Sequence, residues 1–253
     1  MNEPGIQRVA LVTGGAVRLG RAISVGLAEA GYDLVVHFRS SRAPADEVVR
    51  LVEGLGRRCV PVRADLADPA AAPTLVETAR SGYGRLDLLV NSAASFDERR
   101  LLDVDADAWD EVMDLNVRAV HLLVRAAAPL LAATRGAVVN LLDLSAFQPW
   151  TEYPAHAVSK AALAHLTRVQ ARALAPEIRV NAVAPGAVLP PDGYPAERLE
   201  TLRERTPLQT LGSPEDVVQA VIFLAGANFV TGQILAVDGG RLLGPAGPPT
   251  AEG

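Results

Sequence analysis

Residues Arg8 to Gly20 read Arg-Val-Ala-Leu-Val-Thr-Gly-Gly-Ala-Val-Arg-Leu-Gly, and the fold prediction starts from this segment. An apolar run ends at Thr13, Gly14 and Gly15 follow at once, and a segment of helical character comes next. A strand that enters a helix through glycines is typical of a dinucleotide-binding unit, because the backbone can approach a pyrophosphate at the helix N-terminus. An isolated glycine pair would indicate only a tight turn. Its position after the first strand favours cofactor binding.

Beyond this segment, short apolar runs alternate with longer stretches rich in Ala, Leu, Arg and Glu. The predicted strands span residues 8–13, 33–37, 59–63, 86–90, 137–142, 178–183 and 233–237. The predicted helices span residues 19–31, 43–56, 69–82, 107–134, 152–175 and 214–226. This alternation predicts an α/β fold, a doubly wound parallel sheet of about seven strands with helices on both faces. We expect one domain over residues 1–243, followed by a flexible Gly/Pro-rich tail, residues 244–253.

The composition excludes several classes of protein. The 253 residues are 49% hydrophobic and carry a net charge of -5 without a basic cluster, so neither disorder nor a nucleic-acid partner is expected. The sequence has no run of about 18 uncharged apolar residues, so no membrane-spanning helix is expected. The first residues lack the pattern of a secretory signal. The single cysteine, Cys59, cannot form an internal disulfide, which favours a cytoplasmic location.

The end of the second predicted strand indicates which dinucleotide binds. An NAD site usually places an acidic residue about 20 residues past the glycines, where it binds the ribose 2′-hydroxyl. This chain instead reads His37-Phe38-Arg39-Ser40. Guanidinium and hydroxyl donors suit a 2′-phosphate, although a solvated basic loop is the alternative interpretation. We expect NADP(H) as the cofactor, with His37, Arg39 and Ser40 in its site.

Further short motifs follow the glycine turn in order. Asp65-Leu66 comes after the third predicted strand, Asn91-Ser92-Ala93-Ala94 after the fourth, and Ala184-Pro185-Gly186 after the sixth. Together with the last strand and its Asp238-Gly239-Gly240, these motifs resemble the short-chain dehydrogenase/reductase family over roughly residues 6–243. The resemblance implies a Rossmann fold, a homotetramer and a catalytic role for Asn116. It also implies that the cofactor is bound by Thr13, Gly14, Arg18, Leu19, Gly20, Asp65, Leu66, Asn91, Ser92, Ala93, Pro185 and Gly186.

Within this family, the sequence is most similar to the pteridine reductases. Arg18 stands where most members have the middle glycine of the turn, and Phe96 follows the Asn-Ser-Ala-Ala segment. Asp143 stands thirteen residues before the active-site position, where most members have serine. The resemblance implies that Phe96 stacks on a pterin, that Arg18 faces substrate and pyrophosphate, and that Asp143 delivers a proton. The segment 185–191, which includes Leu189, is similar to the substrate loop of this group.

The family's Tyr-x-x-x-Lys motif is altered in this chain. It reads His156-Ala-Val-Ser-Lys160, and Lys160 is the only lysine. On a helix, this spacing places both side chains on one face. An imidazolium donates a proton near neutral pH, so we expect His156, Asp143 and Lys160 to form a proton network. The resemblance implies that Lys160 also anchors the nicotinamide ribose. Tyr153, one turn before His156, is an alternative acid and a candidate substrate contact.

Other polar residues have simpler interpretations. Several carboxylates (Asp103, Asp105, Asp107, Asp110 and Glu111) surround a predicted helix start, where negative charge matches the helix dipole. His121 and His165 lack the spacing of metal ligands, and Cys59 is expected to be buried and inert. We therefore expect no metal site.

Three functions remain open. The first is NADPH-dependent reduction of a dihydropterin or dihydrofolate C=N bond, favoured by Phe96 and Asp143. The second is reduction of another carbonyl or imine by the same kind of enzyme. The third is NADP(H) binding without turnover, which the histidine at position 156 keeps open.

Overall fold

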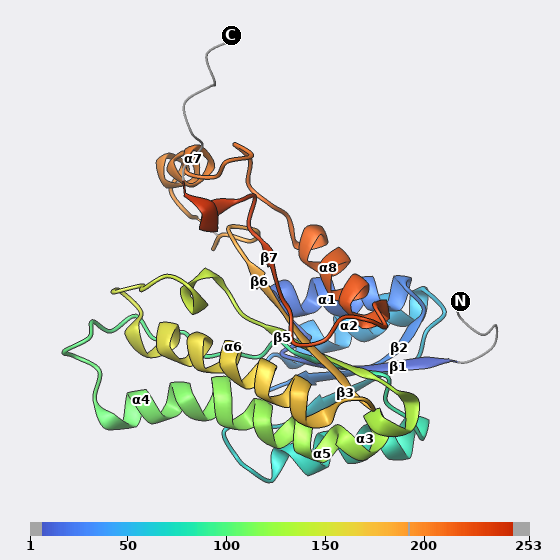
Figure 1. Ribbon diagram of the computed structural model, residues 1–253. Coiled ribbons are helices and arrows are strands. Elements are labelled where there is room, and N and C mark those ends of the chain that lie inside the picture. The colour runs from blue at the N-terminus through green and yellow to red at the C-terminus, as the bar shows by residue number, and fades with distance from the viewer. Residues whose placement is uncertain (1–6, 192, 245–253) are drawn as a thin grey trace.

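The computed structural model describes residues 7–191 and 193–244, which form a parallel sheet between two layers of helices (Figure 1). The strand order is β3-β2-β1-β4-β5-β6-β7. The strands are β1 (Arg8–Thr13), β2 (Tyr32–Phe38), β3 (Cys59–Arg63), β4 (Leu88–Asn91), β5 (Ala137–Leu141), β6 (Arg179–Pro185) and β7 (Ile234–Val237). This confirms the predicted α/β fold. The strand order reverses between β1 and β4, which is where such sheets form a ligand-binding crevice.

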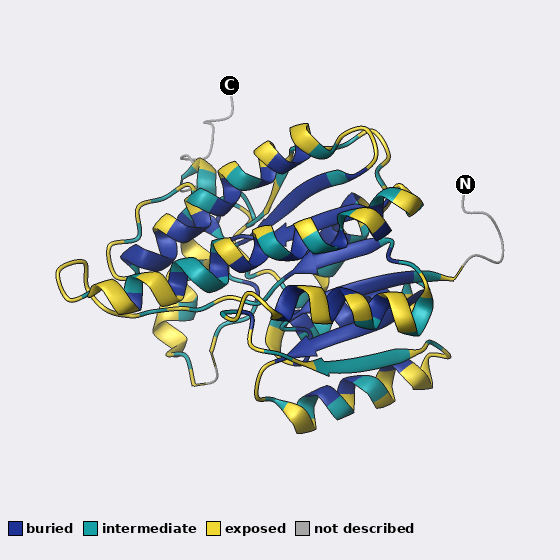
Figure 2. Ribbon diagram, turned by 90° about the horizontal axis from the view of Figure 1, so that it is seen from below, coloured by how far each residue is buried: buried dark blue, intermediate teal, exposed yellow. Residues whose placement is uncertain are grey.

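Alternating side chains of the sheet build two cores. Val9 and Leu11 of β1 pack with α3 (Ala71–Tyr83), α5 (Ala119–Thr134) and α6 (Pro154–Leu174). Ala10 and Val12 pack on the opposite face with α1 (Arg18–Glu29), α2 (Arg42–Gly54) and α8 (Pro214–Gly226). Figure 2 shows the buried strands enclosed by helices whose outer faces are exposed.

The expectation that Cys59 is buried is corrected by its position on an edge strand of the sheet. Cys59 begins β3, whose first four residues are half-buried because this strand has a neighbour on one side only. The thiol is therefore not fully buried as predicted. Burial nevertheless raises its pKa to about 12, with further contributions from Glu53 and Asp33, so it remains in the unreactive thiol form at neutral pH.

The predicted continuous helix over residues 107–134 is interrupted. It consists of α4 (Ala106–Met113), one π-helical segment (Asp114–Arg118) and α5. A π segment adds a residue to one turn and is frequent at functional sites. Here it contains Asn116, which is buried. Hydrophobic periodicity does not reveal such an insertion, which is why the prediction missed it.

Helix α7 (Ala196–Glu204) was not predicted either. None of its residues is buried, and only Leu199 and Leu202 are large apolar residues among the charged ones, so the apolar signal of this helix is weak. The other helix and strand bounds lie within two residues of the predicted ones. The predicted tail, residues 244–253, lies outside the described residues apart from Gly244.

The combined helix Ala106–Thr134 is long and apolar enough to cross a membrane by length and composition alone, with a window of mean hydropathy 1.3. In the fold, however, Leu123, Ala127 and Leu131 belong to the core against the sheet, α3 and α6. A core helix of a globular domain passes the same compositional test, so this stretch does not overturn the expectation of no membrane-spanning helix.

Candidate active site

A cleft of about 540 Å³ opens beside the carboxyl ends of the central strands. It is bordered by the turn after β1, the end of β2, the turn after β3 and the loop after β4. Its lining includes many of the predicted cofactor residues, namely Gly14, Arg18, Leu19, Gly20, His37, Arg39, Ser40, Asp65, Leu66, Ser92 and Ala93, together with Phe96. The structure therefore brings the separate sequence motifs together at one site.

The glycine turn is packed so closely that side chains are excluded. Gly14 has a φ of 62°, and a Cβ there would lie 3.1 Å from the Cα of Ala93. A Cβ on Gly20 would overlap the carbonyl oxygen of Gly14. Thr13 fixes the opposite wall, because its Oγ1 accepts hydrogen bonds from the backbone N–H groups of Ser92 (2.9 Å) and Ala93 (3.1 Å). This cradle before α1 fits the pyrophosphate of a dinucleotide.

Arg18 has a backbone conformation that favours glycine. Its φ is 48°, which costs a non-glycine residue about 1–2 kcal/mol. From the border of the cleft, its side-chain Nη2 donates a hydrogen bond to the carbonyl oxygen of Leu189 at 2.8 Å. Arg18 thus joins the glycine turn to the segment after β6, which was the predicted substrate loop.

The end of β2 presents donors without a carboxylate. Arg39 and Ser40 are exposed at the cleft, and Arg63 donates from Nε to the backbone oxygen of Arg39 at 3.1 Å. Asp65 is exposed, and its Oδ1 accepts from the N–H of Ala67, whereas Leu66 is buried. This arrangement fits the 2′-phosphate of NADP(H).

Asp143 and His156 form a close pair. Asp143 follows β5 and caps a short 3-10 turn, while His156 lies in the first turn of α6. Their Oδ2 and Nε2 atoms are 2.6 Å apart. The His156 side chain is only 3% exposed and that of Asp143 is 21% exposed, so Asp143 is the member of the pair that solvent or a ligand can reach.

The electrostatics of the pair depend on neighbouring donors. Burial raises the pKa of the Asp143 carboxyl, but the hydrogen bond from His156, the charge of Lys160 and a bond from Ser145 outweigh it, so the pKa lies below its ordinary value. Burial lowers the pKa of Lys160, and the Asp143 charge partly opposes this. Lys160 Nζ donates to the carbonyl oxygen of Leu141 at 2.8 Å.

Asn116 contacts the loop after β4 rather than Lys160. Its Oδ1 accepts from the N–H of Ser95 at 2.8 Å, and its Nδ2 donates to the Ser95 carbonyl oxygen at 3.1 Å. The same Nδ2 donates to Ser159 Oγ at 2.9 Å. Sequence reasoning missed Ser95, Ser145 and Ser159. Only the last has a local signal, because it directly precedes the single lysine.

Aromatic rings cover His156 and form one wall of the site. The ring centroid of Phe96 lies 4.4 Å from that of His156 and 4.4 Å from that of Tyr153. Tyr153 in turn lies 6.4 Å from Trp150. Burial raises the pKa of the Tyr153 hydroxyl, and the charges of Glu98 and Glu152 add to this effect.

The remaining predicted residues lie on neighbouring strand ends. Asn91 ends β4, and its Nδ2 donates to Asn140 Oδ1 at 2.8 Å, so it ties two strands together. Pro185 ends β6 opposite Val237 of β7. Gly186 follows it, where a Cβ would lie 2.9 Å from the Cα of Asp238.

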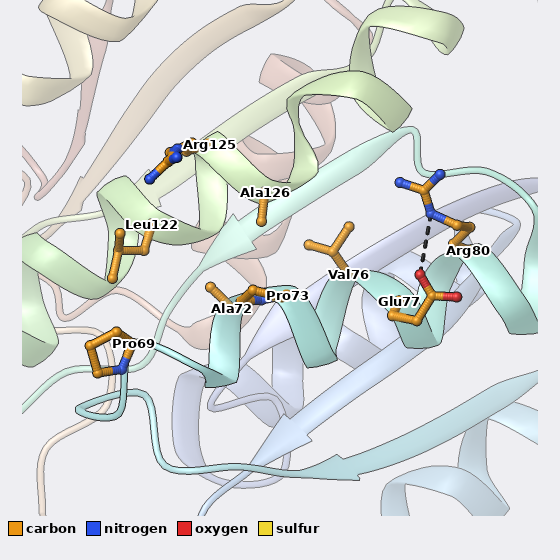
Figure 3. Close-up of a pocket in the computed structure, with 9 residues that line it drawn as sticks. All are labelled: Pro69, Ala72, Pro73, Val76, Glu77, Arg80, Leu122, Arg125 and Ala126. Atoms are coloured by element: carbon orange, nitrogen blue, oxygen red, sulfur yellow. Dashed lines mark ion pairs between the residues drawn. The ribbon is translucent and has the colours of Figure 1, made fainter.

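A second hollow, of about 510 Å³, lies between α3 and α5 and contains none of the predicted site residues (Figure 3). Its rim holds Glu77 and Arg80, which pair with each other at 3.4 Å. Across residues 7–191 and 193–244, no group of three or more His, Cys, Asp or Glu side chains could hold a metal ion. Asp105 instead caps α4, as the helix-dipole interpretation of the acidic cluster predicts.

Comparisons with known proteins agree with this geometry. A family model described as enoyl-(acyl carrier protein) reductase matches residues 15–241. The 3-oxoacyl-(acyl-carrier-protein) reductase of Staphylococcus aureus is 33% identical over 240 residues, which cover 92% of this chain and 98% of that protein. The solved structure of a short-chain alcohol dehydrogenase from Sinorhizobium meliloti, whose assignment is provisional, matches with a TM-score of 0.89 and 33% identity, covering 94% of this chain and 98% of that one. A blue fluorescent protein from a metagenomic library, solved with NADPH, matches with a TM-score of 0.85 and 36% identity, covering 92% and 97%.

Proposed function

The chain belongs to the short-chain dehydrogenase/reductase family of oxidoreductases, and from this premise we propose that it is an NADPH-dependent reductase of a planar C=N substrate of the dihydropterin or dihydrofolate class. The cofactor supplies the hydride when it is bound. The residues of the chain then have to hold the substrate, exclude water and deliver one proton.

One observation carries the proposal. Asp143 is the partly exposed member of a pair whose other member, His156, is buried. A carboxyl at this position can donate a proton to a ring nitrogen, and the buried imidazole behind it can supply the next one. Reduction of a C=N bond places the proton on nitrogen, where Asp143 can deliver it. The reaction therefore depends less than ketone reduction does on the tyrosine that the family resemblance predicts at position 156.

The aromatic wall supports a flat substrate. Phe96 is half exposed and lies against Tyr153, so one ring face borders the cleft that also contains the glycine turn. A heteroaromatic ring gains stacking energy on such a wall, typically about 0.5–1.5 kcal/mol beyond its burial. Leu189, which accepts the hydrogen bond from Arg18, would close the site from the side of β6.

Lys160 is proposed to anchor the nicotinamide ribose. It is buried behind Asp143, and its ammonium already has a hydrogen bond to Leu141. An ammonium has three donors, so two remain for ribose hydroxyls. The same charge favours the ionised form of Asp143 between turnovers.

The test is an NADPH-oxidation assay with dihydrobiopterin, dihydrofolate and a simple ketone, run beside a cofactor-binding titration. We expect oxidation with a dihydropterin-type substrate and little with the ketone. Oxidation with ketones alone would favour the second candidate, a carbonyl reductase, which the similarity to the staphylococcal 3-oxoacyl reductase supports. Binding of NADPH without oxidation of any substrate would favour a non-catalytic relative. A homotetrameric assembly and a cytoplasmic location remain predictions.

A further inference from the structure

Both ring nitrogens of His156 face oxygen atoms. Nδ1 lies 3.0 Å from the carbonyl oxygen of Ser95, and Nε2 lies 2.6 Å from Oδ2 of Asp143. A backbone carbonyl can only accept a hydrogen bond. Nδ1 must therefore carry a proton for this contact to exist, and the tautomer protonated at Nε2 alone would place two lone pairs against each other.

From this geometry we propose that His156 is a fixed Nδ1–H donor, that His156 and Asp143 together hold one further transferable proton between Nε2 and Oδ2 at neutral pH, and that Asn116 is the positioning residue that maintains this state through Ser95. The use of this proton in turnover rests on the proposed function. The protonation state itself does not.

Asn116 fixes the Ser95 carbonyl in place. It bonds both the N–H and the carbonyl oxygen of Ser95, and its second amide proton goes to Ser159 Oγ. The Ser159 hydroxyl donates to the carbonyl oxygen of His156 at 2.7 Å, which closes a ring of contacts around the imidazole. All the donor hydrogens of the Asn116 amide are used, so it cannot rotate without breaking several bonds.

The other end of the pair is equally constrained. Oδ1 of Asp143 accepts from the N–H of Ser145 at 2.8 Å and from the Ser145 hydroxyl, so the histidine meets Oδ2. Lys160 on α6 and Tyr153, which directly precedes this helix, are titratable groups near the pair, and the charges of Glu98, Glu152, Tyr194 and Arg198 act on Tyr153. The Phe96 ring covers the imidazole, which is 3% exposed at its side chain, and limits exchange with solvent.

The proton balance of a turnover follows from these contacts. The Nε2 proton passes to Oδ2 of Asp143, and the O–H bond then breaks as an N–H bond forms with the π electrons of the substrate C=N, whose carbon receives the hydride. The pair is left as a carboxylate beside a neutral imidazole that keeps its Nδ1 proton. Asp143 is the partly exposed member, so it regains a proton from solvent and returns it to Nε2.

The experiment is a two-bond ¹H–¹⁵N spectrum of ¹⁵N-histidine-labelled protein without cofactor, recorded between about pH 6 and 8. The four histidines are assigned by single substitutions. We expect Nδ1 of His156 to remain protonated throughout, with a far-downfield proton shared with Asp143 that disappears in Asp143→Asn while the Nδ1 proton stays. Exposed His121 and His165 serve as internal references for side chains in contact with solvent. An unprotonated Nδ1 at neutral pH would overturn the proposal, whatever the activity assay gives.

Asn116→Ala tests the positioning role. We expect faster exchange of the Nδ1 proton and a displaced pH profile of turnover in this variant. Asn181→Ala is the matched control, because Asn181 is also buried and also bridges backbone groups, at Val230 and Gln233, away from the site. A His156 spectrum that changes equally in both variants, or in neither, would show that Asn116 has no specific role.

Discussion

The imidazole of His37, at the end of β2, accepts a hydrogen bond from the backbone N–H of Gly14 at 3.1 Å. Its other nitrogen lies 3.1 Å from the carbonyl oxygen of Ala64, which fixes the Nε2–H tautomer. The buried histidine therefore supports the glycine turn and connects the ends of β1, β2 and β3 at the cleft. Protonation of Nδ1 would replace this acceptor with a donor and break the contact.

The first prediction follows from this contact and concerns acid stability. Burial lowers the pKa of His37, although the Ala64 hydrogen bond and Asp65 oppose it. Below about pH 6.5, the unfolded chain takes up a proton that the folded chain resists, so stability falls as the pH falls from about 6.5 and levels off once the pH is below the lowered folded pKa. Between these two pKa values we expect the slope of stability against pH to be shallower in His37→Gln than in the natural protein, by at most about 1.4 kcal/mol per pH unit. Urea unfolding at several pH values measures it, with the exposed His121→Gln as control.

The second prediction concerns cofactor choice. Arg39 is exposed at the cleft and forms no ion pair among the described residues. Arg39→Ala should weaken NADPH binding by roughly 1.5–3 kcal/mol, because a charged hydrogen bond to the 2′-phosphate is lost, and should leave NADH binding nearly unchanged. Arg42→Ala is the control, since Arg42 is already paired with Asp46 at 2.9 Å. Fluorescence titration measures the affinities for both cofactors. Equal affinities of the natural protein for NADPH and NADH would contradict the assignment of NADP(H) as the cofactor.

The third prediction separates backbone strain from side-chain contact at Arg18. Arg18→Gly removes a positive-φ penalty of about 1–2 kcal/mol but loses about 0.5–1 kcal/mol to the greater freedom of glycine in the unfolded chain, so its stability should be equal or slightly higher. Arg18→Ala keeps the strain and should be less stable than Arg18→Gly. Both variants lose the bond to Leu189 and should bind NADPH more weakly. Thermal unfolding beside binding titrations distinguishes the two effects, and unchanged affinity in both would show that the contact with Leu189 has no function.

Most of the fold, but only part of the candidate site, could be predicted from the sequence. The strand end at Thr13 was predicted as observed and that of β6 within two residues of Pro185, because buried parallel strands are continuous apolar runs bounded by glycine or proline. The contacts of Asn116 could not, because they depend on a π insertion that shifts its direction without changing the apolar pattern. His37 was expected to bind cofactor; it lines the cleft and also supports the turn through a buried hydrogen bond, which residue type alone does not reveal.

The fourth prediction concerns Asp143. Asp143→Asn keeps the shape and the hydrogen bonds to Ser145 but cannot pass on a proton, so turnover of a dihydropterin should fall about 10²-fold or more while NADPH affinity is retained. Ser145→Ala removes one donor to the same carboxylate and should have a smaller effect. Steady-state kinetics with a saturating cofactor measure both variants. Natural turnover in Asp143→Asn would reduce this residue to a structural cap of the turn after β5.

The last prediction concerns His156, because it separates an enzyme from a binding relative. His156→Phe leaves the Ser95 carbonyl and Asp143 Oδ2 without their imidazole partner, so it should lower stability by about 1–3 kcal/mol and remove most turnover, while the distant Arg39 end of the cleft still binds NADPH. His156→Tyr introduces the residue that the family resemblance predicts at this position and should add ketone reduction, because a tyrosine hydroxyl can donate to a carbonyl oxygen. Circular dichroism confirms that each variant is folded before NADPH oxidation is followed with a dihydropterin and a ketone.

Unchanged dihydropterin turnover in His156→Phe would show that the histidine only fills space and that Asp143 exchanges its proton with water. A natural protein that is inactive with every substrate but gains activity in His156→Tyr would identify a binding relative that has lost its chemistry.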